Sequence, residues 1–100
     1  MLLKQIADAL EAMRKTLDGI NKEQTSNYFE LVYSMNIRHN NLDPTNKGNY
    51  NPVFASYSPV EQETWYDLVY AQALMLFMLL EQQERNKKIS EYKQARANVK

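Results

Sequence analysis

The chain has 100 residues, a length that fits one domain, and 44% of them are hydrophobic, which argues against disorder throughout. The absence of cysteine excludes a disulfide framework and any thiolate metal site. The 12 basic and 12 acidic side chains give a net charge of zero, but the two signs are unevenly distributed along the chain.

The first residues, Met1 to Gln5, lack the basic region and the apolar stretch of a signal peptide. No apolar run reaches the ~18 residues that a transmembrane helix needs. We therefore expect a cytoplasmic protein with no membrane contact.

The first predicted element is a helix over residues 2–19. Gly19 lies where such a helix would end. A narrow apolar stripe of this kind packs against another helix, which belongs either to the same chain or to a second one. The stripe has the alternating spacing of a heptad and consists of Leu3, Ile6, Leu10, Met13, Leu17 and Ile20.

Residues 27–37 are interpreted as a short second helix. Asn27 and Glu30 have the spacing of a capping box at its start. The apolar residues of this segment also alternate as in a strand. The sequence holds no second strand candidate, however, and a lone strand has no partner for its backbone hydrogen bonds. Helix is therefore the prediction.

Residues 38–58 are predicted to form a long loop, because Asp43-Pro44 and Asn46-Lys47-Gly48 have the composition of turns. A loop of this length is uncommon in a small domain and is usually either functional or disordered. Its apolar residues argue against disorder. Three aromatic residues either hold the loop against the domain, which is the preferred interpretation, or form a partner-binding loop: Tyr50, Phe54 and Tyr57.

Residues 59–97 are predicted to form one long helix. Ser58 and Glu61 match a capping box, Pro59 suits the first turn, and no glycine or proline follows. The middle of this helix is apolar on nearly every side, which predicts burial on every side, and the two short helices cannot wrap it. We therefore expect an oligomer interface formed by Leu68, Leu74, Met75, Leu76, Phe77, Met78, Leu79 and Leu80.

The last segment, residues 85–100, holds six basic residues and one acidic residue, whereas the rest of the chain is acidic. Cations near a helix C-terminus complement the helix dipole, and this is the preferred interpretation. The alternative is a basic stripe that contacts nucleic acid. The residues that share one face there are Arg85, Lys88, Tyr92 and Arg96.

No catalytic residue, metal site or cofactor is predicted. The only histidine, His39, is expected to be a solvated loop residue. Glu81 and Glu84 resemble the acidic pair with which helical nucleotide pyrophosphohydrolases of the MazG type bind magnesium. Those enzymes need a second acidic pair, and the candidates, Asp8 and Glu11, lie in a segment without the remaining pattern. Each glutamate also has a cation four residues on, which predicts simple ion pairs.

The sequence thus predicts an all-α fold: a small helical domain with a heptad-like N-terminal helix, a short second helix, a long loop and a long C-terminal helix. The leading functional hypothesis is a non-enzymatic binding or assembly protein whose partner is itself, as a homo-oligomer, or another protein. A nucleic-acid-associated regulator that uses the basic C-terminal helix is second, and a metal-dependent nucleotide hydrolase is third. We recognise no family in the sequence. Its small size, lack of cysteine and many Asn, Tyr and Met residues resemble the composition of small phage proteins.

Overall fold

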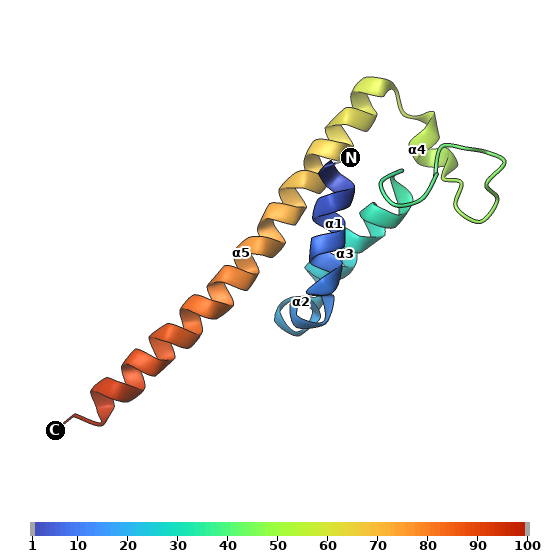
Figure 1. Cartoon of the computed structure of the whole chain (residues 1–100). Helices are drawn as coiled ribbons and strands as arrows, with labels where there is room; N and C mark the ends of the chain where they lie inside the picture. Colours follow the sequence, from blue (N-terminus) through green and yellow to red (C-terminus); the bar gives the residue numbers. More distant parts are fainter. Residues whose placement is uncertain (1, 100) are drawn as a thin grey trace.

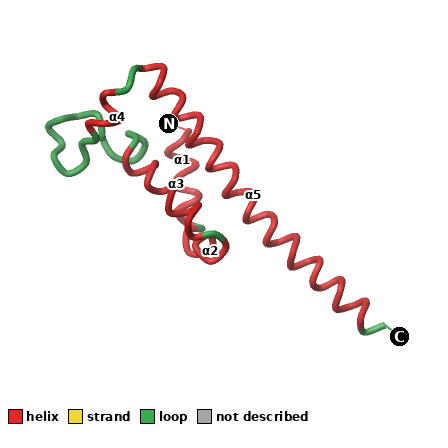
Figure 2. The backbone as a smooth tube through the Cα atoms, turned by 180° about the vertical axis from the view of Figure 1, so that it is seen from behind, coloured by secondary structure: helices red, strands yellow, loops and turns green. Residues whose placement is uncertain are grey.

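The computed structural model describes residues 2–99, and the protein is all-α, as predicted (Figure 1). Helices α1, α2 and α3 gather beside the first half of α5, and α5 continues far beyond them (Figures 1 and 2). The molecule is therefore elongated, measuring 70 × 25 × 21 Å. The helices are α1 (Leu2–Ala12), α2 (Arg14–Ile20), α3 (Lys22–Ser34), α4 (Pro52–Ser56) and α5 (Pro59–Ala97).

The long helix α5 has the bounds that the sequence predicts. Its capping box is formed in both directions: the Ser58 hydroxyl accepts from the backbone N–H of Glu61 at 3.1 Å, and the Glu61 carboxylate accepts from the backbone N–H of Ser58 at 3.0 Å. Pro59 is the first helical residue, where its missing N–H costs no intrahelical bond. Among residues 2–99, no helix is both long enough and apolar enough to cross a lipid bilayer.

The predicted helix over residues 2–19 is interrupted at Met13, which corrects that prediction. Met13 has φ −102° and ψ 5° and separates α1 from α2. The break turns α2 so that Leu17 stays in the core together with Leu10, while Met13 is 39% exposed. A second change of direction follows at Asn21, the single residue between α2 and α3. The heptad spacing of residues 3–20 encodes neither of these two changes of direction.

Helix α3 begins five residues before the predicted start, at Lys22, and ends at Ser34. Its cap is Asn21, whose side-chain oxygen accepts from the backbone N–H of Gln24 at 3.1 Å. Asn27 lies inside the helix and is exposed, so the capping box predicted at Asn27 and Glu30 is wrong. The choice of helix over strand is confirmed as far as Ser34.

The predicted helix over residues 27–37 ends three residues early, at Ser34. The segment that follows is irregular as far as Asn51 (Figure 2), and asparagine side chains stabilise it. Asn36 adopts φ 59°, a left-handed conformation that asparagine tolerates better than most residues. Asn36 and the buried Asn41 each accept from the other's backbone N–H, at 3.1 and 2.7 Å. Asn51 donates to the carbonyl of Ser34 at 2.8 Å and caps α4 by accepting from Phe54. The predicted loop therefore contains one short helix and is tied to the end of α3.

The hydrophobic core lies where α5 meets α1, α2 and α3. Two aromatic residues of α3, Tyr28 and Phe29, lie edge to face with ring centroids 5.1 Å apart. Phe54 of α4 extends the core toward the start of α5, where it contacts the ring of Tyr66 at a centroid distance of 5.6 Å. The buried apolar residues are Ala7, Leu10, Leu17, Tyr28, Phe29, Val32, Met35, Ile37, Phe54, Val69, Ala73 and Leu76.

The two valines of α5 provide a matched test of this core. Val69 is 1% exposed and Val60 is 73% exposed. Val69→Ala removes buried methyl groups and leaves a cavity, so we expect it to lower the free energy of unfolding by about 2–3 kcal/mol. Val60→Ala should change it by about 0.5 kcal/mol or less. Urea titration followed by circular dichroism measures both, and equal effects would show that α5 does not pack as described.

A second test uses the ionisation of Tyr28, whose pKa burial raises to about 12, with the charge of Arg38 opposing that rise. An exposed tyrosine in the unfolded chain titrates near about 10. The contribution of the neutral phenol to stability is therefore complete below about pH 10 and is lost as the pH rises to about 12. We expect this loss to be on the order of 2–3 kcal/mol.

Urea titrations at about pH 9 and about pH 12 measure this loss. Tyr28→Phe is the control, because phenylalanine keeps the buried ring and has no proton to lose. The variant should lose less stability than the wild type over this range. An equal loss in both proteins would contradict the assignment to Tyr28.

Candidate interface on the C-terminal helix

Helix α5 buries one narrow line of side chains in the protein. Val69, Ala73 and Leu76 are each 1% exposed, and their spacing of four and three residues places them on one helical face. This line contacts α1, α2 and α3. Leu79 and Leu80 are half-buried beside this line, and the other large apolar residues of the segment are exposed. The described residues therefore do not provide the burial on every side that the sequence predicts.

The uncovered part of this segment is large. Its six residues have exposed fractions from 37% to 57%. Since a large side chain buries about 150–250 Å² when covered, they leave on the order of 500 Å² of apolar area in contact with solvent. A patch of this size lies in the range of the largest apolar patches on monomeric proteins, and such patches are often functional. We call it the exposed apolar surface, and it consists of Leu68, Tyr70, Leu74, Met75, Phe77 and Met78.

The structure divides the predicted interface residues into two groups. Leu68, Leu74, Met75, Phe77 and Met78 belong to the exposed apolar surface. The other three pack within the chain, so they offer less surface to a partner than the sequence predicts. Those three are Leu76, which is buried, and Leu79 and Leu80, which are half-buried against the core.

Beyond Leu80, α5 leaves the other helices, and every residue from Glu81 to Val99 is exposed (Figure 1). We call residues 81–97 the projecting segment. The predicted basic stripe lies here, where its side chains share a helical face but contact no other element. Arg85 forms an ion pair with Glu81 at 3.8 Å. Tyr92 is 64% exposed and the neighbouring Ile89 is 48% exposed, so the projecting segment also carries uncovered apolar area.

Charge is separated along α5. Its start carries Glu61, Glu63 and Asp67, all exposed, and no basic residue. Residues 68–80 hold no charged side chain. The projecting segment holds five basic and three acidic residues. The helix therefore has an acidic start, an apolar middle and a basic end.

The loop predicted to bind a partner packs mostly against the rest of the chain. Phe54 is 1% exposed and lies in the core, which corrects its assignment as a contact residue. Tyr57 stacks on Trp65, with ring planes 4° apart and centroids separated by 6.3 Å. Tyr50 is 36% exposed. Two of the three aromatic residues therefore hold the loop against α5.

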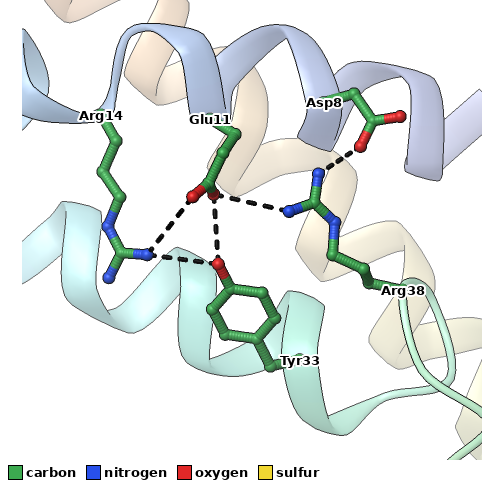
Figure 3. A network of polar contacts seen from close by, with 5 residues as sticks. All are labelled: Asp8, Glu11, Arg14, Tyr33 and Arg38. Atoms are coloured by element: carbon green, nitrogen blue, oxygen red, sulfur yellow. Dashed lines mark hydrogen bonds and ion pairs between the residues drawn. The ribbon is translucent and has the colours of Figure 1, made fainter.

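A polar cluster that the sequence does not reveal joins α1, α2 and α3 to the following segment (Figure 3). Arg38 pairs with Asp8 and approaches the carboxylate of Glu11 at 3.7 Å. Arg14 approaches the other oxygen of Glu11 at 3.8 Å and donates to the Tyr33 hydroxyl at 3.2 Å. That hydroxyl donates to Glu11 at 3.2 Å. The two carboxylates are thus matched by two guanidinium groups.

Because each carboxylate is paired with a guanidinium group, we interpret the cluster as structural. The hydrogen bond that Arg38 donates to Asp8 and the charges of both carboxylates raise the pKa of Arg38, so the guanidinium stays charged. Asp8 and Glu11, which would be the second acidic pair of a nucleotide hydrolase, are engaged by arginine. His39 is exposed, with its ring 5.8 Å from that of Tyr33. Residues 2–99 contain no group of three or more histidine, aspartate or glutamate side chains placed to hold a metal ion.

No protein-family model, curated protein or solved structure matches the chain. The geometry of α5 is therefore the basis on which a function is proposed.

Proposed function

We propose that this protein is a non-enzymatic association protein that forms a homo-oligomer through the exposed apolar surface of α5. The observation that carries the proposal is that surface itself: six large apolar side chains side by side on a helix that the rest of the chain covers on one face only. Water contact with so much apolar area is unfavourable, and pairing with a second apolar surface removes it.

The size of the surface supports a specific interface. A stable protein–protein interface buries about 800 Å² on each partner, with an apolar core and a polar rim. The exposed apolar surface supplies on the order of 500 Å² of such a core. Polar and charged residues of α5 border it on both sides along the helix and are available as the rim.

The placement of the ionisable residues supports a role without catalysis. Glu81 and Glu84 lie on the projecting segment, open to solvent. The acidic pair that could face them, Asp8 and Glu11, is bound to arginine side chains (Figure 3). A general acid or base needs a positioned group in a protected site, and exposed His39 has no such site.

Charged substitutions on the exposed apolar surface test the proposal. Leu74 is 46% exposed and Met78 is 57% exposed, and both lie outside the core. Leu74→Asp and Met78→Asp should therefore keep the helical content but lose association, because each places a carboxylate where two apolar surfaces meet. The matched control is Val53→Asp, which changes an apolar residue of α4 that is 62% exposed.

Sedimentation velocity over a range of protein concentrations provides the measurement. The wild type and Val53→Asp should sediment as a species heavier than the 11.8 kDa chain, and the other two variants as the 11.8 kDa chain. A wild type that remains a monomer at high concentration would refute the proposal, as would an unchanged mass in both α5 variants.

A second candidate function is nucleic-acid binding by the projecting segment, because its cations are exposed and extend away from the body. Against it, three acidic residues share the segment with five basic ones, and Glu81 pairs with Arg85. We expect a gel-shift titration of duplex DNA at low salt to show no complex.

A complex at moderate salt would reverse this ranking if three conditions held together. Its log–log salt slope should be about −3 to −4, the value for three or four phosphate contacts. The combined variant Arg85→Gln, Lys88→Gln and Arg96→Gln should abolish it. Circular dichroism should show that this variant remains helical.

A further inference from the structure

The free face of α5 carries a second heptad stripe, opposite the buried line. Ala71, Leu74 and Met78 each lie two residues from a buried residue of that line, which corresponds to about 200° around the helix. Continuing the four- and three-residue spacing in both directions extends the stripe from the first turn into the projecting segment. Every member is exposed: Val60, Thr64, Asp67, Ala71, Leu74, Met78, Glu81, Arg85, Lys88 and Tyr92.

This stripe is symmetric about residue 76. Leu74 and Met78 lie at equal distances on either side of that position, and so do Asp67 and Arg85, as well as Val60 and Tyr92. An antiparallel helix pair aligns residues that are equally far from its two-fold axis. Two copies of α5 aligned in this way would bring Leu74 onto Met78 at the centre and Asp67 onto Arg85 farther out. The other pairs of the stripe would be Ala71 with Glu81, Thr64 with Lys88, and Val60 with Tyr92.

We propose that the exposed apolar surface packs against the same surface of a second copy of the chain, with the two α5 helices antiparallel. Leu74 then faces the partner's Met78, and Asp67 faces the partner's Arg85. This inference rests on the proposed function and specifies its geometry.

Charge decides between the two orientations. In a parallel pair, the acidic start of one helix, with its three carboxylates and no cation, would lie beside the same carboxylates of the other. Like charges facing each other cost stability and are a common device against wrong pairing. In the antiparallel pair, each acidic start lies beside the basic projecting segment of the partner, and the two helix dipoles oppose each other favourably.

The same arrangement covers the projecting segment. Residues 81–93 of one copy lie along residues 59–71 of the partner's α5, so the exposed Ile89 and Tyr92 gain a neighbour. Helices α1 to α3 pack on the opposite face of α5 and remain on the outer sides of the pair. The projecting segment thereby extends the contact beyond the exposed apolar surface, toward the area that a stable dimer needs.

Single-cysteine cross-linking tests the orientation, because the natural chain contains no cysteine. Thr64→Cys and Lys88→Cys are prepared separately, and each is treated with a short bismaleimide alone and as an equimolar mixture after subunit exchange. Positions 64 and 88 are about 36 Å apart along one helix. The antiparallel pair brings position 64 next to the partner's position 88, so we expect covalent dimers only in the mixture. Covalent dimers in each variant alone would show a parallel pair and overturn the inference.

Charge reversal gives an independent test of the proposed contact. Asp67→Arg and Arg85→Asp each create two repulsive contacts per dimer, so we expect each to weaken dimerisation about ten-fold. The double variant restores opposite charges and should recover most of that loss. The matched control is Glu63→Arg, a reversal at an exposed position outside the stripe, which should have a smaller effect. Failure of the double variant to recover affinity would contradict the Asp67–Arg85 contact.

The outcomes separate this inference from the proposed function. A wild type that sediments as a monomer refutes both. A dimer that cross-links as a parallel pair refutes only the antiparallel geometry. The third outcome is a dimer that cannot be cross-linked in the single variants or in the mixture, although its cysteines react with a monomaleimide. That result places the interface elsewhere and likewise refutes the geometry.

Discussion

The structure depends on one line of contact, in which Val69, Ala73 and Leu76 of α5 pack against the three N-terminal helices. These helices are short, and together they cover one face of a helix that runs from Pro59 to Ala97 (Figure 1). Six large apolar residues on its other faces remain 37% to 57% exposed. The same constraint that builds the core therefore leaves an apolar surface open, and we propose that association with a second copy covers it.

Polar groups fix the body against which α5 packs. The cluster of two arginines, two carboxylates and Tyr33 joins α1, α2 and α3 and holds Arg38 at the start of the irregular segment (Figure 3). Asn51 then links the end of α3 to α4, and Gln62 of α5 donates to the carbonyls of Phe54 and Tyr57, both at 3.2 Å. These bonds hold the short helices α1 to α4 in one arrangement against the start of α5. They also engage Asp8 and Glu11, the acidic pair considered for metal binding.

The parts of the fold that local signals encode were predictable. The cap at Ser58 and the absence of glycine and proline after Pro59 define α5. The break at Met13 was not predictable, because no glycine or proline lies there and no side chain caps the helix that follows. In the interface, Leu74 and Leu76 have the same chemistry, and only the position of the other helices decides which is covered. The contact of Arg38 with Asp8 joins residues 30 positions apart, and no spacing rule reveals it.

Amide hydrogen exchange of the projecting segment tests the central claim most directly. An isolated helix of about this length is only marginally stable in water, so residues 81–97 of a monomer should exchange fast. If a second copy covers α5, protection of these amides and of residues 68–80 should rise together with protein concentration, while protection of α3 stays constant. Fast exchange in residues 81–97 at every concentration, with no change in residues 68–80, would contradict the account.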